Sequence, residues 1–263
     1  MSTQETVLVV VDPQQETHPA MDRAIANAKI RKPEERSRLV ILVTPDTDDL
    51  AKTPVIKGQG WLSGLMSMAF QDKVEYQLEL GWGASLPQVL HNAVEKYQAN
   101  LVMLPLYKNG NDKVLNDDRW NFLRNAQTPV LLIRPENNRP RKKLLAAIKV
   151  QDSKYQQLNQ TVASRGQWAA QRYNADLHLV NCYSDSMHFP DRSAIARLAD
   201  VPNERIHVQQ GDPDQVIPRV AKDIDADMIL MGTQRRTGLK GALRGNTVEK
   251  IIGGLPQDVM MLV

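Results

Sequence analysis

The chain has 263 residues, of which 42% are hydrophobic and 24% are charged. This is the composition of a globular protein with one large domain or two small ones, and it excludes a disordered, collagen-like or disulfide-stapled chain. Basic residues exceed acidic ones by three, which is too few for the dense basic stripe of a nucleic-acid-binding protein.

The sequence also bears on the compartment. No apolar run approaches the ~18 residues that a membrane helix needs, and the polar start at Met1 lacks the basic region of a signal peptide. The single cysteine, Cys182, cannot form an internal disulfide and fits a reducing environment. We therefore expect a cytoplasmic protein with no membrane span and no nucleic-acid partner.

In the first half of the chain, five apolar, strand-like runs alternate with amphipathic segments. Such alternation predicts a parallel sheet wrapped by helices. Residues 52–70 are rich in Trp, Leu and Met, which favours a helix over this sheet; a Met-rich groove for a ligand or partner is the alternative. The predicted strands are 6–11, 39–44, 74–80, 101–104 and 130–133, with helices near 18–31 and 84–97.

A polar segment then divides the chain almost in half. Residues 135–143 contain two prolines and no apolar side chain, which predicts a solvated linker between domains 1–138 and 139–263. The first domain carries 15 basic and 17 acidic residues and the second 18 and 13. The positive surplus of the second domain therefore suits an anionic ligand.

The second half repeats the pattern of the first. Its predicted strands are 144–150, 176–182, 205–209, 228–231 and 259–263, with helices near 153–174 and 214–223. The sequence thus predicts an α/β protein of two tandem, doubly wound, Rossmann-like domains, each with a five-stranded parallel sheet.

Doubly wound sheets bind ligands beyond the carboxyl ends of their strands, where the strand order reverses. In the second domain, four glycines fall within 14 residues after the fourth strand, and their backbone amides, with the following helix N-terminus, could cradle a phosphate. An Asn-capped helix behind a polar loop is the alternative. The candidate ligand-binding residues here are Gly232, Thr233, Arg235, Arg236, Gly238, Gly245, Asn246 and Thr247.

Residues 231–250, Met-Gly-Thr-Gln-Arg-Arg-Thr-Gly-Leu-Lys-Gly-Ala-Leu-Arg-Gly-Asn-Thr-Val-Glu-Lys, resemble the C-terminal signature of universal stress proteins. Residues 211–217 and 226–232 resemble the same family, and the first half resembles the degenerate N-terminal domain of its tandem members. The resemblance covers nearly the whole chain. It implies two universal stress protein domains and a stress-response role that is non-enzymatic, with a nucleotide motif of Gly, two residues, Gly, nine residues, Gly and Ser or Thr.

Two of the four motif positions depart from the family. Gly232 and Gly245 match, but Arg235 stands for the second glycine and Asn246 for the Ser or Thr. The family's ribose-binding Asp at the end of the first strand is Lys149 here, which brings a positive charge into a partly buried crevice. The resemblance places the nucleotide base near the end of the second strand, where Asn181 and Tyr183 border the crevice, and Val180 is a further candidate binding residue.

These departures argue against ATP as the cofactor, and an unknown anionic or apolar ligand is the alternative. The first domain has the reverse defect: it keeps Asp12 at the family's Asp position but has no glycine cradle over 105–113. Asp12 is therefore interpreted as a turn or helix-entry residue.

Three functions remain open. The preferred one is a non-enzymatic, ligand-binding regulatory protein that acts through the C-terminal crevice and through protein partners. The second is an ATP-binding switch or weak ATPase, and the third is a scaffold with vestigial crevices. The five histidines show no metal-ligand spacing and no nucleophile elbow appears, so we assign neither metal-binding nor catalytic residues.

The resemblance also implies an intramolecular pseudo-dimer. Tandem members look like a fused version of a single-domain dimer, so we expect the halves to pack through strands 130–133 and 259–263. Homodimerisation of the whole chain stays open.

Overall fold

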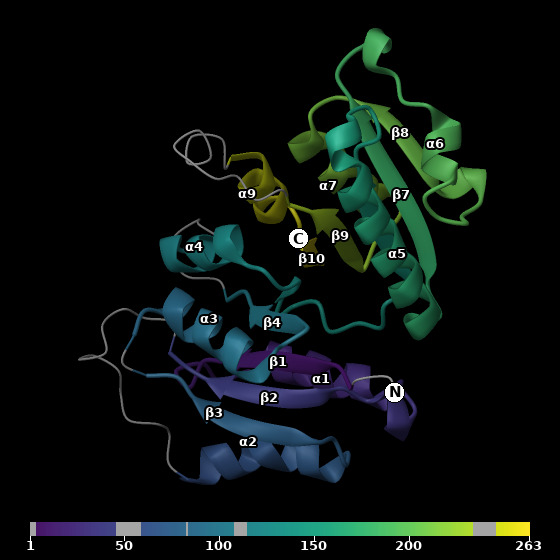
Figure 1. The fold of residues 1–263 in the computed structure, drawn as a ribbon. Helices are drawn as coiled ribbons and strands as arrows, with labels where there is room; N and C mark the ends of the chain where they lie inside the picture. Colours follow the sequence, from purple (N-terminus) through teal and green to yellow (C-terminus); the bar gives the residue numbers. More distant parts are fainter. Residues whose placement is uncertain (1–3, 46–58, 83, 108–114, 234–245) are drawn as a thin grey trace. The chain divides into compact units, whose positions relative to one another are not determined.

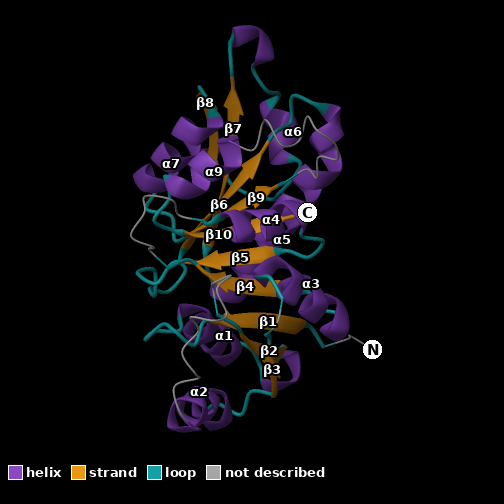
Figure 2. Cartoon of the chain, turned by 90° about the vertical axis from the view of Figure 1, so that its left-hand side faces the viewer, coloured by secondary structure: helices purple, strands orange, loops and turns teal. Residues whose placement is uncertain are grey.

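The computed structural model describes residues 4–45, 59–82, 84–107, 115–233 and 246–263. The chain forms two compact units, Met1–Asn138 (unit 1) and Arg139–Val263 (unit 2). Each unit contains a parallel five-stranded sheet with helices on both faces (Figures 1 and 2). The predicted α/β, Rossmann-like fold class is confirmed. The expected packing of the two halves through their last strands stays a prediction.

The sheet of unit 1 has the strand order β3-β2-β1-β4-β5, with all neighbours parallel. Its central strands are buried, whereas the edge strand β3 is half exposed. Helices α1 and α3 lie on opposite faces (Figure 2). The elements are β1 (Thr6–Val11), α1 (Pro19–Lys29), η1 (Pro33–Glu35), β2 (Arg38–Val43), α2 (Gln59–Gln71), β3 (Tyr76–Leu80), α3 (Leu86–Tyr97), β4 (Leu101–Pro105), α4 (Asp117–Asn125) and β5 (Val130–Ile133).

Unit 2 repeats this order as β8-β7-β6-β9-β10, again with all neighbours parallel. Helices α5 and α7 lie on opposite faces of its sheet (Figure 2). The elements are β6 (Lys143–Ile148), η3 (Ser153–Tyr155), α5 (Gln156–Tyr173), β7 (Asp176–Tyr183), η4 (Ser186–His188), α6 (Arg192–Ala196), η5 (Asn203–Arg205), β8 (Ile206–Gln210), α7 (Pro213–Asp223), β9 (Met228–Gly232), α9 (Asn246–Gly253) and β10 (Asp258–Leu262).

Local sequence signals explain where several helices begin and end. A proline lies in the first turn of α1, α3 and α7, where its missing N–H has no intrahelical partner to lose. Gln98 and Asn174 end α3 and α5 in the left-handed conformation, a common way to close a helix. Of the segment predicted as a helix at 52–70, residues 59–70 lie in α2, where Leu65 and Ala69 are buried, and residues 52–58 lie outside the described residues.

The prediction that residues 135–143 form a solvated linker is wrong for residues 141–143. The Arg141 side chain is wholly buried, with one guanidinium nitrogen 2.7 Å from Asp258 Oδ2 and another donating to Tyr173 Oη at 2.7 Å. Asp227 accepts hydrogen bonds from the backbone N–H groups of Lys142 and Lys143. Charged composition suggested solvent exposure, but these partners bind the segment to unit 2.

Candidate functional site

The strand order of unit 2 reverses between β6 and β9, because β7 and β8 continue on one side of β6 and β9 and β10 on the other. Ala147 of β6 pairs with Met231 of β9. Lys149 and Thr233, each two residues further along, therefore leave the sheet at matching positions. This carboxyl end of the sheet is where doubly wound domains bind ligands.

The backbone of Lys149 is held by the side chain of Asn159, a residue of α5 that is only 5% exposed. The Lys149 N–H donates to Asn159 Oδ1 at 2.9 Å, and Asn159 Nδ2 donates to the Lys149 carbonyl at 2.7 Å. The Lys149 residue is exposed, and its Nζ lies 5.0 Å from the ring centroid of Tyr155, a cation–π distance. The prediction of a partly buried charge is therefore corrected: the charge lies at the surface, above the Tyr155 ring.

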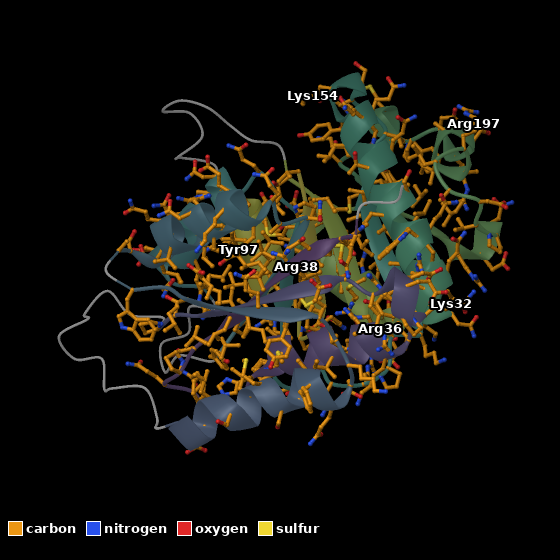
Figure 3. All side chains as sticks on the ribbon, turned by 60° about the horizontal axis from the view of Figure 1, so that its bottom comes forward. Lys32, Arg36, Arg38, Tyr97, Lys154 and Arg197 are labelled. Carbon is orange, nitrogen blue, oxygen red and sulfur yellow. The ribbon has the colours of Figure 1, made fainter. Side chains whose placement is uncertain are left out.

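The turn between β6 and α5 carries a second lysine, which already has a partner. Lys154, labelled in Figure 3, places its Nζ 2.7 Å from Asp152 Oδ2. The Lys154 ammonium lowers the pKa of the Asp152 carboxyl, so this pair is neutral at physiological pH. Within the described part of the chain, no carboxylate lies within ion-pair distance of the Lys149 ammonium, although Lys149 also contributes to the lowered pKa of Asp152. The Lys149 charge lies at the carboxyl end of the sheet.

Two amide side chains join this turn to the end of β7. Asn181 is wholly buried and its Oδ1 accepts from the Val150 N–H at 3.0 Å. Gln151 Nε2 donates to the Cys182 carbonyl at 2.9 Å, whereas Gln151 Oε1 is buried and finds no donor among the described residues. Val180 of β7 pairs with Ala147 of β6. It is 1% exposed and therefore packs in the core.

Gly232 is required by its packing. A Cβ atom there would lie 2.4 Å from Cγ of Leu158 on α5, so any larger residue would force the Leu158 side chain to move. The next residue, Thr233, donates its N–H to the Leu262 carbonyl at 2.8 Å. The predicted site residues Arg235, Arg236, Gly238 and Gly245 lie outside the described residues, as does the side chain of Asn246. Thr247 is exposed in the first turn of α9.

In unit 1, the strand order reverses between β1 and β4, and we call this place in each unit its switch point. Side chains of unit 1 itself bridge its switch point. Tyr107, which follows β4 and is 8% exposed, donates its hydroxyl to the Thr17 carbonyl at 3.0 Å, in the loop after β1. Asp12 is 3% exposed; its Oδ1 accepts from the Gln14 N–H at 2.9 Å and its Oδ2 from Gln15 Nε2 at 3.3 Å. Asp12 therefore shapes a turn, as interpreted from the sequence.

Sequence reasoning did not find Gln151, Tyr155 or Asn159. The one available signal for Asn159 is that it falls on the small and apolar buried stripe of α5, with Val162, Ala163, Gly166 and Ala169. No group of His, Cys, Asp and Glu side chains that could hold a metal occurs in the described segments. Nor does any helix in them have the length and apolar character needed to cross a membrane.

Comparison with known proteins points to one family. The sequence model described as "Universal stress protein family" matches residues 190–262. The chain is 24% identical to a universal stress protein E homolog of Haemophilus influenzae, over 97% of this chain and 96% of that protein. It is also 24% identical to universal stress protein E of Salmonella typhi, over 100% of this chain and 95% of the relative.

Solved structures agree with this likeness. A putative universal stress protein from Pseudomonas aeruginosa superposes with a TM-score of 0.81 at 26% identity, covering 99% of this chain and 93% of that one. A universal stress protein from Archaeoglobus fulgidus, at 14% identity and a TM-score of 0.66, shares the fold over 97% of this chain and 95% of its own. The C-terminal part of the chain therefore matches the universal stress protein family, and the whole chain resembles universal stress protein E in sequence and a putative universal stress protein in fold.

Proposed function

We propose that this protein is a non-enzymatic regulator of the stress response, whose unit 2 binds a small ligand and whose protein partners respond to the bound state. The contrast between the two switch points carries the proposal. In unit 1, Tyr107 bridges the loops after β1 and β4. In unit 2, the exposed Lys149 follows β6, and Thr233 follows the neighbouring strand β9 at the start of the glycine-rich segment.

The chemistry of unit 2 favours an anionic ligand. The Lys149 charge attracts an anion, and the buried Gln151 Oε1 is an acceptor that a ligand N–H or O–H could satisfy. A lysine cannot accept a hydrogen bond from a ribose hydroxyl. These features support a ligand that is recognised by its anionic group and by a hydrogen-bond donor, and not by a ribose.

An ATP-binding switch is the second candidate. Gly232 and Gly245 keep two positions of the nucleotide motif, and α9 begins directly after the glycine-rich segment, where its N-terminus favours a phosphate. Lys149 and Arg235 oppose this candidate, because each replaces a residue that the family uses for the nucleotide.

Thermal unfolding with inorganic triphosphate tests the proposal. At about 100 times its dissociation constant, a ligand adds about 2.7 kcal/mol to the stability of the folded state. We expect triphosphate to raise the Tm of nucleotide-stripped protein, and Lys149→Gln to abolish most of that rise. Lys142→Gln is the matched control, because Lys142 is an exposed lysine just before β6 and Lys149 lies just after it. An equal rise in both variants, or no rise in the parent, would contradict the proposal.

A further inference from the structure

Two histidines on neighbouring strands of unit 2 form a side-chain pair. His178 lies on β7 and His207 on the edge strand β8, and His178 Nδ1 is 3.0 Å from His207 Nε2. The ring planes are within 18° of each other and the centroids are 5.3 Å apart. This separation means that the rings meet edge to edge, with one nitrogen of each directed at the other. One ring must donate a proton and the other must accept it.

The pair lies on the α7 face of the sheet and is half buried. Successive residues of a strand point to opposite faces, and Leu177 is the side chain that meets Gly166 of α5 on the other face. On the face of the pair, Val180 stands in register with His207. The contact therefore joins β7 to β8 in addition to the backbone ladder.

The charged groups around the pair are mostly cationic. Lys143 of β6, Arg205 of η5 and Arg192 of α6 disfavour a protonated ring, whereas Asp176 of β7 and Asp223 of α7 favour it. Asp176 is already engaged with Arg205 at 2.9 Å. A first added proton can enter the outer nitrogen of the donor ring and leaves the hydrogen bond in place. When both rings are protonated, two N–H groups face each other and the contact breaks.

We propose that the His178–His207 pair is an acid-sensitive latch, which holds the edge strand β8 against β7 at neutral pH and weakens progressively in acid. This device is independent of the crevice and gives the protein a response to proton concentration itself.

The direction of the pH effect follows from linkage. Burial, then the His207 ring, then Arg205 lower the pKa of His178 from 6.5 to about 4, and burial and Arg192 lower the pKa of His207. The unfolded or opened state, with ordinary histidines, therefore takes up protons first as the pH falls below 6.5. The latch stabilises unit 2 fully above that pH and is lost as the pH falls toward about 4.

Hydrogen exchange of the full chain tests the proposal. After correction for intrinsic exchange, we expect peptides from β7 and β8 to open about tenfold more often at a pH about one unit below the ordinary histidine pKa than at neutral pH. In His178→Gln and in His207→Gln, one titrating ring is lost while burial still lowers the pKa of the other, so the acid effect should fall by at least about threefold. His188→Gln, at an exposed histidine of the same unit, should keep the full effect. Equal acid effects in all four proteins would overturn the proposal.

A second measurement does not depend on the variants folding. NMR titration of the histidine rings in the unmodified protein should show that the pKa of His178 lies near 4 and that the pKa of His207 is lowered from its ordinary value. Two rings at positions 178 and 207 that titrate at their ordinary pKa would overturn the latch.

Discussion

Gly232 has no Cβ atom, and this leaves room for the Leu158 side chain of α5 at the end of β9. A Cβ atom would lie 2.4 Å from Leu158 Cγ, so we expect Gly232→Ala to lower the free energy of unfolding by about 1–3 kcal/mol through overpacking. Urea unfolding measures this loss. Leu158→Ala in the same chain should remove the clash, so the two substitutions should not be additive.

Gly64 on α2 is the matched control for this prediction. No atom lies within 4 Å of a Cβ built there, and alanine is favoured over glycine in a helix by roughly 0.5–1 kcal/mol. Gly64→Ala should therefore be neutral or stabilising. If Gly232→Ala were tolerated equally well, the packing role of Gly232 would be refuted.

Cys182 shows how burial controls a side chain's reactivity. Burial raises the pKa of its thiol to about 11, with only a small opposing effect from Arg219. The thiolate, which is the reactive form, is therefore scarce at neutral pH. We predict that iodoacetamide alkylates the native protein much more slowly than the urea-unfolded chain. Equal rates, followed by mass spectrometry, would show that the thiol is accessible and ionised.

Site residues could be predicted only where a motif marks them. Lys149 and Gly232 follow from counting along the family signature, and the turn role of Asp12 follows from its place after a strand. Gln151 and Asn159 could not be found in this way, because their roles depend on which face of α5 and which turn atoms meet the end of β7. That information is tertiary and leaves little trace in the local sequence.

At the scale of elements, the strands were predictable because central parallel strands are buried on both faces and form continuous apolar runs. β1 begins and ends where predicted, and the run at 144–150 lies within two residues of β6. The linker was not predictable from composition. Its charged residues suggested solvent exposure, but the structure places Arg141 against Asp258 and Tyr173 inside unit 2.

The Arg141–Asp258 pair should therefore be a sensitive point of the fold. Removing one partner of a buried pair leaves an uncompensated charge, which typically costs about 3–5 kcal/mol. We predict a loss of this size for Arg141→Ala in chemical unfolding. Arg141→Met combined with Asp258→Leu should lose less, because no buried charge remains. A single substitution without effect would mean that the pair does not stabilise the element that begins unit 2.

At the scale of the whole molecule, one strand order occurs twice and the two switch points have diverged. Unit 1 bridges its switch point with Tyr107 and has the buried Asp12 after its first strand. Unit 2 has the exposed Lys149 after its own first strand. This asymmetry supports a division of labour in which unit 2 binds the ligand and the degenerate unit 1 does not. The repeat itself was visible in the sequence, whereas the closure by Tyr107 was not, because it requires the loops after β1 and β4 to meet.

Isothermal titration with ATP and magnesium tests the central claim most directly, namely that Lys149 and Arg235 have turned the crevice of unit 2 away from the family's nucleotide. The titration compares nucleotide-stripped protein with a Lys149→Asp, Arg235→Gly double variant. The account predicts no binding heat from the unmodified protein and restored binding in the variant. Micromolar binding by the unmodified protein would contradict the claim and make the ATP switch the leading function, and heat from neither protein would show that these two side chains are not what excludes ATP.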